Sequence, residues 1–467
     1  MRATAVLLML ALLLGCSGAG REPPRNLLLI SVDTLRADRL GAWGHAPHVS
    51  PFLDSLAEQG VVFEQTVAQS PWTAPSHAAM LTSTWPSLFG FAGAYTGPET
   101  QGFIHSDAIS LAEVLRDAGW RTQAVTAGGF VAARFGFDQG FEAYGERGAT
   151  LRAAVAQALA WLDARDGDEP FFLFLHTYDV KRYRAGSAQR KLLESRHGIR
   201  LPDRRPLAAL LQSNDVKALP EITPAFRAFV VELYDAAITR ADTELHRLWQ
   251  ELERRDLAAA TLFVVTSDHG EEFWEHGSSG HGYSLHDENV RVPLILRHPS
   301  LTPQRIAAQV RLVDLAPTLV HLLGLAVPQA WSGVSLVPWI EGTGEDLPAF
   351  SEAAHRPLKA VRTPSYKLVL SAAPPRLEFF DLGRDPGETR ALADRSHPQR
   401  EPLERLLRRW IEANAADRRF ASGGAAKLSP QVRRQLAQLG YAGDREESRR
   451  LSTERWLEIL SEADRAR

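Results

Sequence analysis

Two short segments of the sequence place metal-binding residue types directly after apolar runs. Asp33 follows NLLLISV, and Asp268-His269-Gly270 follows TLFVVTS. Two carboxylates and an imidazole suit a hard or borderline divalent cation, such as Ca²⁺, Mn²⁺, Mg²⁺ or Zn²⁺. Each segment also has a simpler interpretation, because an aspartate after a strand often caps the next helix. The two segments therefore predict a metal site only if the fold brings them together.

A hydroxyl that could act as a nucleophile lies in a third segment, SPWTAPSHAAMLTST at residues 70–84. Pro75 suits the first turn of a helix that AAML continues, so we expect Thr73 just ahead of the helix N-terminus. Free N–H groups and the helix dipole favour an anion there, whether a sulfate, a phosphate or an alkoxide. The alternative is that Thr73 only caps the helix.

Strands and helices alternate along the part of the chain that carries these residues. Continuous apolar runs predict buried strands, while serine or Ser-Pro starts and glycine ends predict helices. The expected strands are 26–32, 121–127, 171–176 and 261–267, and the expected helices lie at 50–60, 110–119 and 224–257. This alternation predicts an α/β fold with a mostly parallel central sheet flanked by helices. Ligands collect at the carboxyl ends of such strands, where Asp33 and Asp268 lie.

The composition limits the possible classes of protein. The chain has 467 residues, 45% hydrophobic and 23% charged, which is typical of a globular protein and excludes disordered or collagen-like chains. A net charge of −3, without a block of like charge, does not favour a nucleic-acid partner. A single cysteine excludes an intrachain disulfide framework, CxxC sites and iron–sulfur clusters.

That cysteine, Cys16, ends the segment MRATAVLLMLALLLGC. A basic residue followed by a short apolar run predicts a signal peptide over residues 1–15, because the run is too short to span a bilayer. Its end, LLGC, resembles the lipobox of bacterial lipoproteins. We therefore expect a lipidated Cys16 to hold the protein at a membrane surface, in the bacterial cell envelope facing the periplasm or the exterior. An ordinary cleaved signal with a chance cysteine is the alternative.

Several ordered segments together resemble one family. They are NLLLISVDTLRADRLGAWG, SPWTAPSHAAMLTST, FFLFLHTYD, VVTSDHGEEFWEHG and GHGYSLHDENVRVPLI, followed by RLVDLAPTLVHLLGL and EFFDLGRDPGETRALA. Over residues 26–395 the chain is similar to the sulfatase family, within the alkaline phosphatase superfamily. The resemblance implies a large α/β domain with a smaller C-terminal subdomain built on a short antiparallel sheet.

The family motifs assign candidate roles to the residues noted above. Asp33, Asp268 and His269 match the ligands of one divalent cation, for which Ca²⁺ or Mn²⁺ is the first expectation and Mg²⁺ or Zn²⁺ the alternative. Thr73 matches the nucleophile, which also contacts the metal.

The resemblance extends to three further residues. Lys181 and His281 fall near positions where relatives hold the oxyanion of the substrate or protonate the leaving oxygen. His77 occupies a position where sulfatases usually have arginine.

The departures from the family pattern concern the chemistry directly. Sulfatases carry a cysteine or serine at the position of Thr73 and oxidise it to formylglycine, whose hydrate can expel sulfate. Threonine cannot become formylglycine, and superfamily relatives with a threonine nucleophile act on phosphate esters. Thr34 replaces the second aspartate of the usual Asp-Asp pair, and Lys181 stands where a histidine is usual.

Three functions remain open on this basis. The first is a metal-dependent hydrolase that cleaves sulfate or phosphate esters of a small molecule, glycan or lipid through a Thr nucleophile and a covalent intermediate. A phosphoryl-group transferase acting on envelope lipid or glycan is the second, but the sequence shows no membrane-embedded helices of the kind that often accompany such enzymes. A catalytically impaired binding lipoprotein is the third, and the complete set of candidate residues argues against it.

The expected organisation follows from these segments. A linker at 16–25 precedes the catalytic domain at 26–340, which contains a variable insertion at 184–221 without family landmarks. A C-terminal subdomain spans 341–395, and a helical tail spans 396–467, with helices at 402–413, 430–439 and 453–466. The histidines at 276, 281 and 286 cluster after the DHG segment, and the alternative to a substrate contact by His281 is a second cation in this loop.

Overall fold

The computed structural model describes residues 22–465 apart from 47, 90–99, 102, 149, 166–167, 184, 201–206, 208–210, 212–220, 354–355, 418, 421–425 and 428–450. The predicted signal peptide, Cys16, most of the predicted linker and the helix expected at 430–439 lie outside the described residues. The central feature is an eight-stranded sheet in the order β11-β2-β10-β7-β1-β6-β4-β5. Its strands are β1 (Asn26–Val32), β2 (Val61–Val67), β4 (Arg121–Val125), β5 (Ala143–Gly145), β6 (Phe171–Thr177), β7 (Thr261–Thr266), β10 (Arg291–Arg297) and β11 (Gln304–Arg311).

The sheet is mostly parallel, which confirms the predicted fold class. β1 pairs in parallel with β6 and β7, and only β10 runs antiparallel to both of its neighbours, β2 and β7. Alternate residues of β1 enter two different cores, Leu28 and Ile30 on one face and Leu27 and Leu29 on the other. This is the pattern expected of a strand that is covered on both faces.

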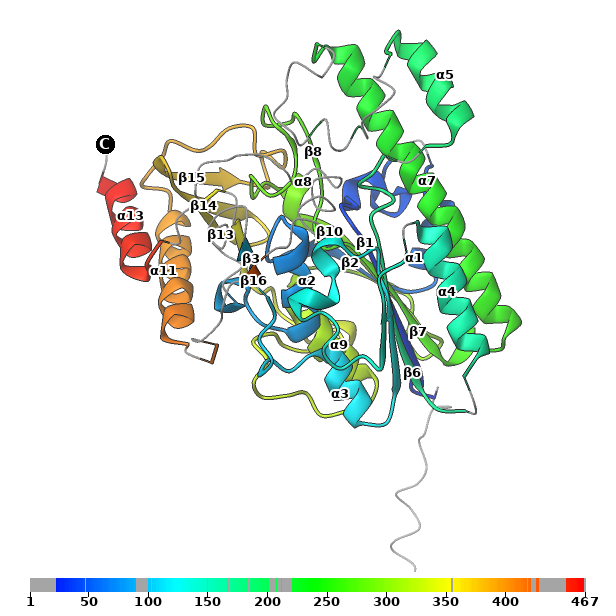
Figure 1. Ribbon diagram of the computed structural model, residues 1–467. Helices are drawn as coiled ribbons and strands as arrows, with labels where there is room; N and C mark the ends of the chain where they lie inside the picture. The colour runs from blue at the N-terminus through cyan, green and yellow to red at the C-terminus, as the bar shows by residue number, and fades with distance from the viewer. Residues whose placement is uncertain are drawn as a thin grey trace, which may run out of the picture.

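Helices cover both faces of the sheet, as Figure 1 shows. On one face lie α1 (Pro51–Glu58), α4 (Leu151–Asp163) and α7 (Pro224–Arg254), with α5 (Ser187–His197) packed against α7. The other face is covered by α2 (Thr73–Thr82), α3 (Leu111–Asp117) and α9 (Leu315–Leu322). The start of α3 is explained by the signal in the sequence, since Ser110 forms a capping box with Glu113 there.

A small antiparallel sheet follows, in the order β12-β13-β14-β15. Its strands are β12 (Ala349–Ala353), β13 (Leu358–Arg362), β14 (Tyr366–Ala372) and β15 (Pro375–Asp381). Two tail helices, α11 (Arg400–Ala416) and α13 (Thr453–Arg465), pack against it through Leu407, Trp410 and Leu460. Two of the three predicted tail helices are thus present, with boundaries shifted by a few residues at most.

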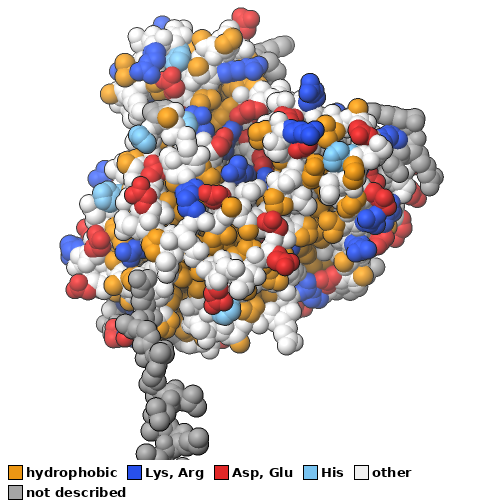
Figure 2. Space-filling view, turned by 180° about the vertical axis from the view of Figure 1, so that it is seen from behind, with side chains coloured by type: hydrophobic (Ala, Val, Ile, Leu, Met, Phe, Trp, Pro, Cys, Tyr) orange, Lys and Arg blue, Asp and Glu red, His pale blue; other side chains and the backbone are white. Residues whose placement is uncertain are grey.

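Several short elements complete the described part of the chain. They are β3 (Thr100–Gln101), β8 (Glu272–Phe273), β9 (Ser279–Gly280), α8 (Asp287–Val290), α10 (Val337–Ile340) and β16 (Ala426–Lys427). None of the helices in the described part of the chain is long and apolar enough to cross a membrane. Seen from behind, the molecule carries Lys and Arg side chains interspersed with Asp and Glu (Figure 2).

Candidate active site

Three adjacent strands end in polar residues at one edge of the central sheet. β1 leads into Asp33, β6 carries His176 near its end, and β7 leads into Asp268 and His269. The register pairs Ser31 with His176 on one side and with Thr266 on the other, so these strand ends are level. The sheet therefore gathers side chains that are far apart in the sequence at the position where parallel sheets bind ligands.

Asp33, Asp268 and His269 form a buried cluster suited to a cation. Each offers a ligand atom, and these atoms lie within 4.8 Å of one another. Asp33 Oδ1 and Asp268 Oδ2 are buried without a hydrogen-bond partner. The Nδ1 of His269 lies 2.9 Å from the carbonyl oxygen of Gly270 and donates to it, which leaves the lone pair of Nε2 on the cluster side. Buried oxygens without donors and an oriented imidazole fit a divalent cation.

The two carboxylates respond in opposite ways to their surroundings. Burial would raise the pKa of Asp33, but the charge of Lys181 and the neighbouring His176 and His269 hold it well below its ordinary value. Burial, and then the charge of Asp33, raise the pKa of Asp268. The surroundings therefore favour the ionised form of Asp33 and disfavour the ionised form of Asp268.

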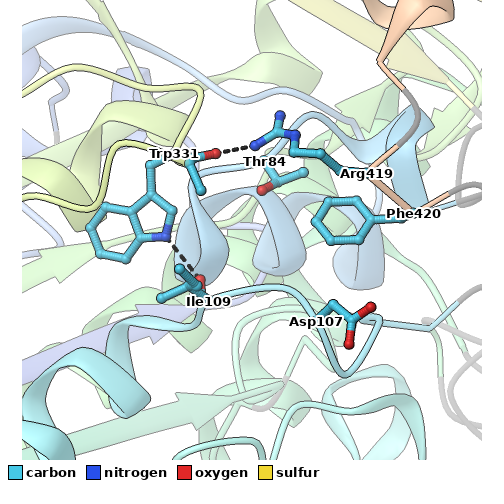
Figure 3. A pocket seen from close by; sticks show the side chains of 7 residues that line it. Thr84, Asp107, Ile109, Trp331, Arg419 and Phe420 are labelled. Carbon is cyan, nitrogen blue, oxygen red and sulfur yellow. Dashed lines mark hydrogen bonds between the residues drawn. The ribbon is translucent and has the colours of Figure 1, made fainter.

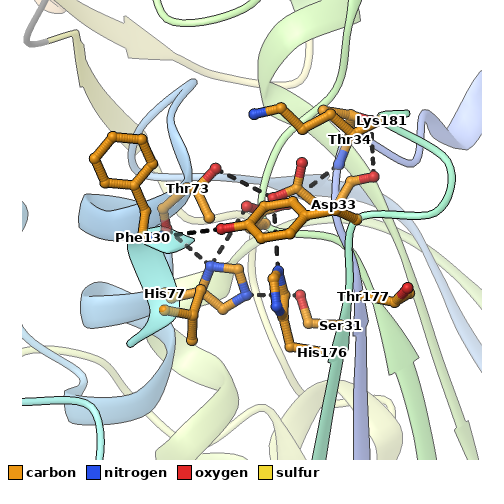
Figure 4. Close-up of polar contacts among 12 residues, drawn as sticks. Ser31, Asp33, Thr34, Thr73, His77, Phe130, His176, Thr177 and Lys181 are labelled. Atoms are coloured by element: carbon orange, nitrogen blue, oxygen red, sulfur yellow. Dashed lines mark hydrogen bonds and ion pairs between the residues drawn. The ribbon is translucent and has the colours of Figure 1, made fainter. Parts of the chain in front are cut away.

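Thr73 is the first residue of α2 and points toward this cluster (Figure 4). Trp72, in extended backbone conformation, is the N-cap, so Thr73 begins the helix instead of preceding it as predicted. Its Oγ1 lies 3.1 Å from Asp33 Oδ2 and 3.3 Å from His269 Nε2. The hydroxyl thus donates to a carboxylate while it lies at the positive end of a helix dipole.

His77 lies one turn further along α2 and is fully buried. Its Nδ1 donates to the carbonyl oxygen of Thr73 at 2.8 Å, and its Nε2 accepts from the hydroxyl of Ser31 at 2.9 Å. Burial lowers the pKa of His77 to about 4, so the ring is neutral at pH 7. Both nitrogens are therefore engaged in connecting the start of α2 to β1.

Lys181 and His281 approach the cluster from two further segments. The Nζ of Lys181 donates to His281 Nε2 at 3.1 Å, and His281 Nδ1 donates to Glu271 at 3.1 Å. Burial lowers the pKa of Lys181 to about 8 against the opposing charges of Asp33 and Glu271. The rings of His281 and His269 lie 4.4 Å apart, centre to centre. Every site residue predicted from the sequence is thus brought into one cluster, although their roles stay predictions.

Among the other residues of the cluster, Thr34 was noted in the sequence only as a departure from the family pattern, and His176 and Ser31 were not singled out. His176 Nε2 lies 3.6 Å from Asp33 Oδ2, and Ser31 orients His77. Thr34 has φ 62°, an uncommon value for a β-branched residue. This strained conformation directs its N–H toward Asp268 Oδ1 at 3.3 Å, and the Tyr234 hydroxyl holds its carbonyl at 2.6 Å. Only the position of His176 at a strand end could have been noticed, because strain and register are tertiary properties.

A separate cavity of about 240 Å³ lies beyond the other end of α2 (Figure 3). Thr84, Ile109, Trp331, Arg419 and Phe420 are among its lining residues. The Trp331 indole donates to the carbonyl oxygen of Ile109 at 2.9 Å. None of the predicted site residues lines this cavity.

The central sheet is mostly parallel and carries carboxylates and imidazoles at the ends of its strands, beside the Thr73 hydroxyl at the start of α2. This combination defines an α/β ester hydrolase of the alkaline phosphatase-like class. A family model described as Sulfatase matches residues 25–325, and the chain belongs to the sulfatase family. A second model, N-sulphoglucosamine sulphohydrolase, C-terminal, matches residues 275–416. The protein is therefore a sulfatase-family ester hydrolase, as the sequence motifs predicted.

Individual relatives are distant in sequence. The chain is 26% identical to the steryl-sulfatase of Mus musculus over 518 residues, covering 85% of this chain and 82% of the relative. A solved structure described in complex with its substrate D-glucosamine-2-N,6-O-disulfate matches with a TM-score of 0.65 at 19% identity, over 84% of this chain and 98% of its own. The phosphonate monoester hydrolase of Agrobacterium radiobacter matches with a TM-score of 0.65 at 20% identity, over 88% and 100%. The solved structures confirm the fold.

Proposed function

We propose that this protein is a divalent-cation-dependent hydrolase of sulfate or phosphate esters, with Thr73 as its nucleophile. The observation that supports this most directly is the convergence of Asp33, Asp268 and His269 on the hydroxyl of Thr73 at the start of α2. A capping residue would have its hydroxyl directed at the backbone of its own helix. The Thr73 hydroxyl is instead directed at a carboxylate and an imidazole.

The residues divide the chemistry among them. Asp33, Asp268 and His269 hold the cation, which when bound lowers the pKa of a neighbouring hydroxyl and withdraws charge from the ester oxygens. Asp33 accepts the hydroxyl proton of Thr73, and the oxygen attacks sulfur or phosphorus in line to form a threonyl ester. Water then attacks the threonyl ester and breaks its bond to Thr73 Oγ1, which takes back the proton held by Asp33. The hydroxyl of the water stays on the released sulfate or phosphate, and its remaining proton restores the group that protonated the alcohol.

Positive charge at the site balances the substrate anion. Lys181 and the N-terminus of α2 stabilise the equatorial oxygens of the transferred group. The departing alkoxide receives a proton from His281 Nε2, which takes that proton up from Lys181 while Nδ1 remains bonded to Glu271. His77 positions Thr73 through the backbone carbonyl of that residue.

Threonine at the nucleophile position favours phosphate esters over sulfate esters. A threonyl intermediate has no second hydroxyl on the same carbon and cannot expel the group by collapse, so it depends on attack by water. The fold accommodates phosphorus esters, since one solved neighbour is described as a phosphonate monoester hydrolase. We place the enzyme in the bacterial envelope, anchored by acyl chains on Cys16, because of its lipobox-like N-terminus.

Turnover of model esters tests this proposal. Purified full-length protein is assayed with p-nitrophenyl sulfate, p-nitrophenyl phosphate and bis(p-nitrophenyl) phosphate in the presence of Mn²⁺, Ca²⁺, Mg²⁺ or Zn²⁺. Thr73→Ala should lower kcat by about 10³-fold or more. Thr82→Ala is the matched control, because Thr82 is buried in the same helix and its hydroxyl donates to the carbonyl oxygen of Ala78. Mass spectrometry after rapid acid quench should find the transferred group on Thr73. Unchanged activity in Thr73→Ala would overturn the nucleophile assignment, and faster sulfate turnover would overturn the phosphate preference.

A further inference from the structure

A second group of metal-binding side chains lies outside the proposed active site. His276 is in the loop between β8 and β9, His286 directly precedes α8, and Glu288 is within α8. Each offers a ligand atom, and the three atoms lie within 4.8 Å of one another. The two imidazole rings are stacked, with centroids 3.6 Å apart and planes inclined by 16°.

The polar atoms that face one another in this group are not satisfied by hydrogen bonds. His276 Nε2, His286 Nδ1 and Glu288 Oε1 are all buried without a hydrogen-bond partner. His276 Nε2 lies 3.0 Å from Glu288 Oε1, which is within ion-pair distance. The Glu288 side chain is 8% exposed, so solvent reaches little of it. Buried nitrogen and oxygen atoms in this state are costly unless something binds them.

We propose that His276, His286 and Glu288 form a second cation site, selective for zinc and separate from the Asp33–Asp268–His269 cluster. Two imidazoles and one carboxylate are ligands that zinc prefers, whereas calcium and magnesium prefer oxygen ligands alone. Zinc–ligand bonds of 2.0–2.2 Å in a tetrahedron place ligand atoms about 3.4 Å apart. The ligand atoms here lie within 4.8 Å of one another, with His276 Nε2 and Glu288 Oε1 3.0 Å apart, so their spacing spans that value.

This site would stabilise the segment that carries two residues of the proposed active site. The backbone N–H groups of Gly270 and Glu271 donate to the carbonyls of Asn289 and Glu288 at 2.9 and 3.0 Å. A side chain at Gly270 would place its Cβ 2.0 Å from the Glu288 carbonyl oxygen, so this close approach requires glycine. Zinc held between the β8–β9 loop and α8 would fix the segment 270–288 at a second point, and with it Glu271 and His281. The site therefore acts in positioning and not in the chemical step.

The far side of the His276 loop is already anchored by the chain itself. Glu272 accepts hydrogen bonds from the backbone N–H groups of His276 and Ser278 at 3.2 and 3.0 Å and from the Ser278 hydroxyl at 2.9 Å. This contact presents His276 toward α8 without involving its imidazole. A loop with a fixed backbone and an imidazole that lacks a hydrogen-bond partner at Nε2 is preorganised to bind a metal.

Zinc stoichiometry tests the proposal independently of the proposed function. Full-length Asp268→Asn, which impairs the first cluster, is stripped with chelator, titrated with Zn²⁺ against a chromophoric competitor, and its bound metal measured by atomic emission. We expect about one equivalent of zinc to remain, and His286→Phe in the same background to weaken this binding by about 100-fold or more. His321→Phe is the matched control, since this histidine bonds to Ser335 elsewhere in the fold. Equal zinc binding in the His286→Phe and His321→Phe proteins would overturn the proposal.

Two further measurements keep the test independent of misfolding. Glu288→Gln preserves shape and removes only the charge, and it should weaken zinc binding similarly while circular dichroism remains unchanged. In the wild-type protein, zinc should slow amide hydrogen exchange over residues 274–288, and Co²⁺ should give the visible absorption of a tetrahedral site. If exchange there is unaffected by zinc and Glu288→Gln binds as tightly as the wild type, the contact is an ordinary ion pair.

Discussion

Two clusters of buried carboxylates in this molecule differ in how their negative charge is balanced. At the seam between the main domain and the small sheet, Asp287 accepts from Arg362 at 2.9 and 2.7 Å and from Lys367 at 2.9 Å. Lys367 also lies 2.9 Å from Glu388. In the candidate active site, by contrast, oxygens of Asp33 and Asp268 have no hydrogen-bond partner.

This difference separates a structural role from a chemical one. Buried carboxylates that the chain neutralises with its own cations connect two parts of a fold. Two buried carboxylates with too few neighbouring cations lower the stability of the fold. Such a pair is retained where it has a function. At the seam, Asp287 is thus balanced by two cations of the chain itself, whereas the Asp33–Asp268 pair becomes balanced only when a cation binds.

The strongest test of the contrast is Asp268→Asn, which removes charge from the active site. We expect kcat/KM to fall by about 10³-fold or more, because a cation ligand is lost. In chelator, however, the free energy of unfolding should stay the same or increase, since one of two like charges has been removed. Ester turnover and urea unfolding in EDTA measure both effects. A marked loss of stability in EDTA would contradict the comparison.

The corresponding change at the seam is Asp287→Asn. It leaves Arg362 buried without a carboxylate and Lys367 with Glu388 alone, which should lower the free energy of unfolding by about 3–5 kcal/mol. The folded fraction should retain its kcat, because Asp287 contacts no residue of the proposed chemistry. Urea unfolding followed by fluorescence measures the loss. Asp168→Asn, at an exposed pair with Arg25, is the control and should change stability by about 1 kcal/mol or less.

The sequence predicts the active-site cluster better than it predicts the seam. Asp33 and Asp268 each follow a strand, and parallel strands end at one edge of their sheet, so local pattern plus topology is sufficient to place them together. The start of α2 was predictable within one residue from Pro75. In the seam, Asp287 meets side chains from β13 and β14, and such pairing depends on how two sheets dock.

Other features of the active site could not be predicted from the sequence, because they depend on tertiary structure. The contact between Lys181 and His281 joins positions 100 residues apart and requires the loop after β6 to meet the β9 loop. The left-handed conformation of Thr34 gives no signal in residue type, since the conformation is disfavoured for threonine. The pairing of His176 with Ser31 needs the register of β1 and β6.

Removal of divalent cations should affect the two clusters differently. A ligand that binds only the folded protein at a concentration of 100 times its Kd stabilises it by about 2.7 kcal/mol. We therefore expect EDTA to lower the melting temperature of the wild type in Mn²⁺ or Ca²⁺, and to have a much smaller effect on Asp268→Asn. In Asp287→Asn, EDTA should lower the melting temperature by as much as in the wild type, although this variant starts from a lower melting temperature. Differential scanning calorimetry distinguishes these cases, and an equal response in all three proteins would argue against a cation at Asp268.

The smallest expected effect is the acid response of the seam. Burial would raise the pKa of Asp287, but Arg362 and Lys367 outweigh it and hold this pKa below the ordinary value of 3.8. A carboxyl with a lowered folded-state pKa stabilises the fold above its unfolded-state pKa and loses this contribution as the pH falls through the folded-state value. The gap in unfolding free energy between wild type and Asp287→Asn should therefore be constant near neutral pH and narrow below about pH 4. Urea unfolding at a series of pH values measures this gap. A gap that stays constant down to pH 2 would mean that the stability of the seam comes from packing and not from the charge of Asp287.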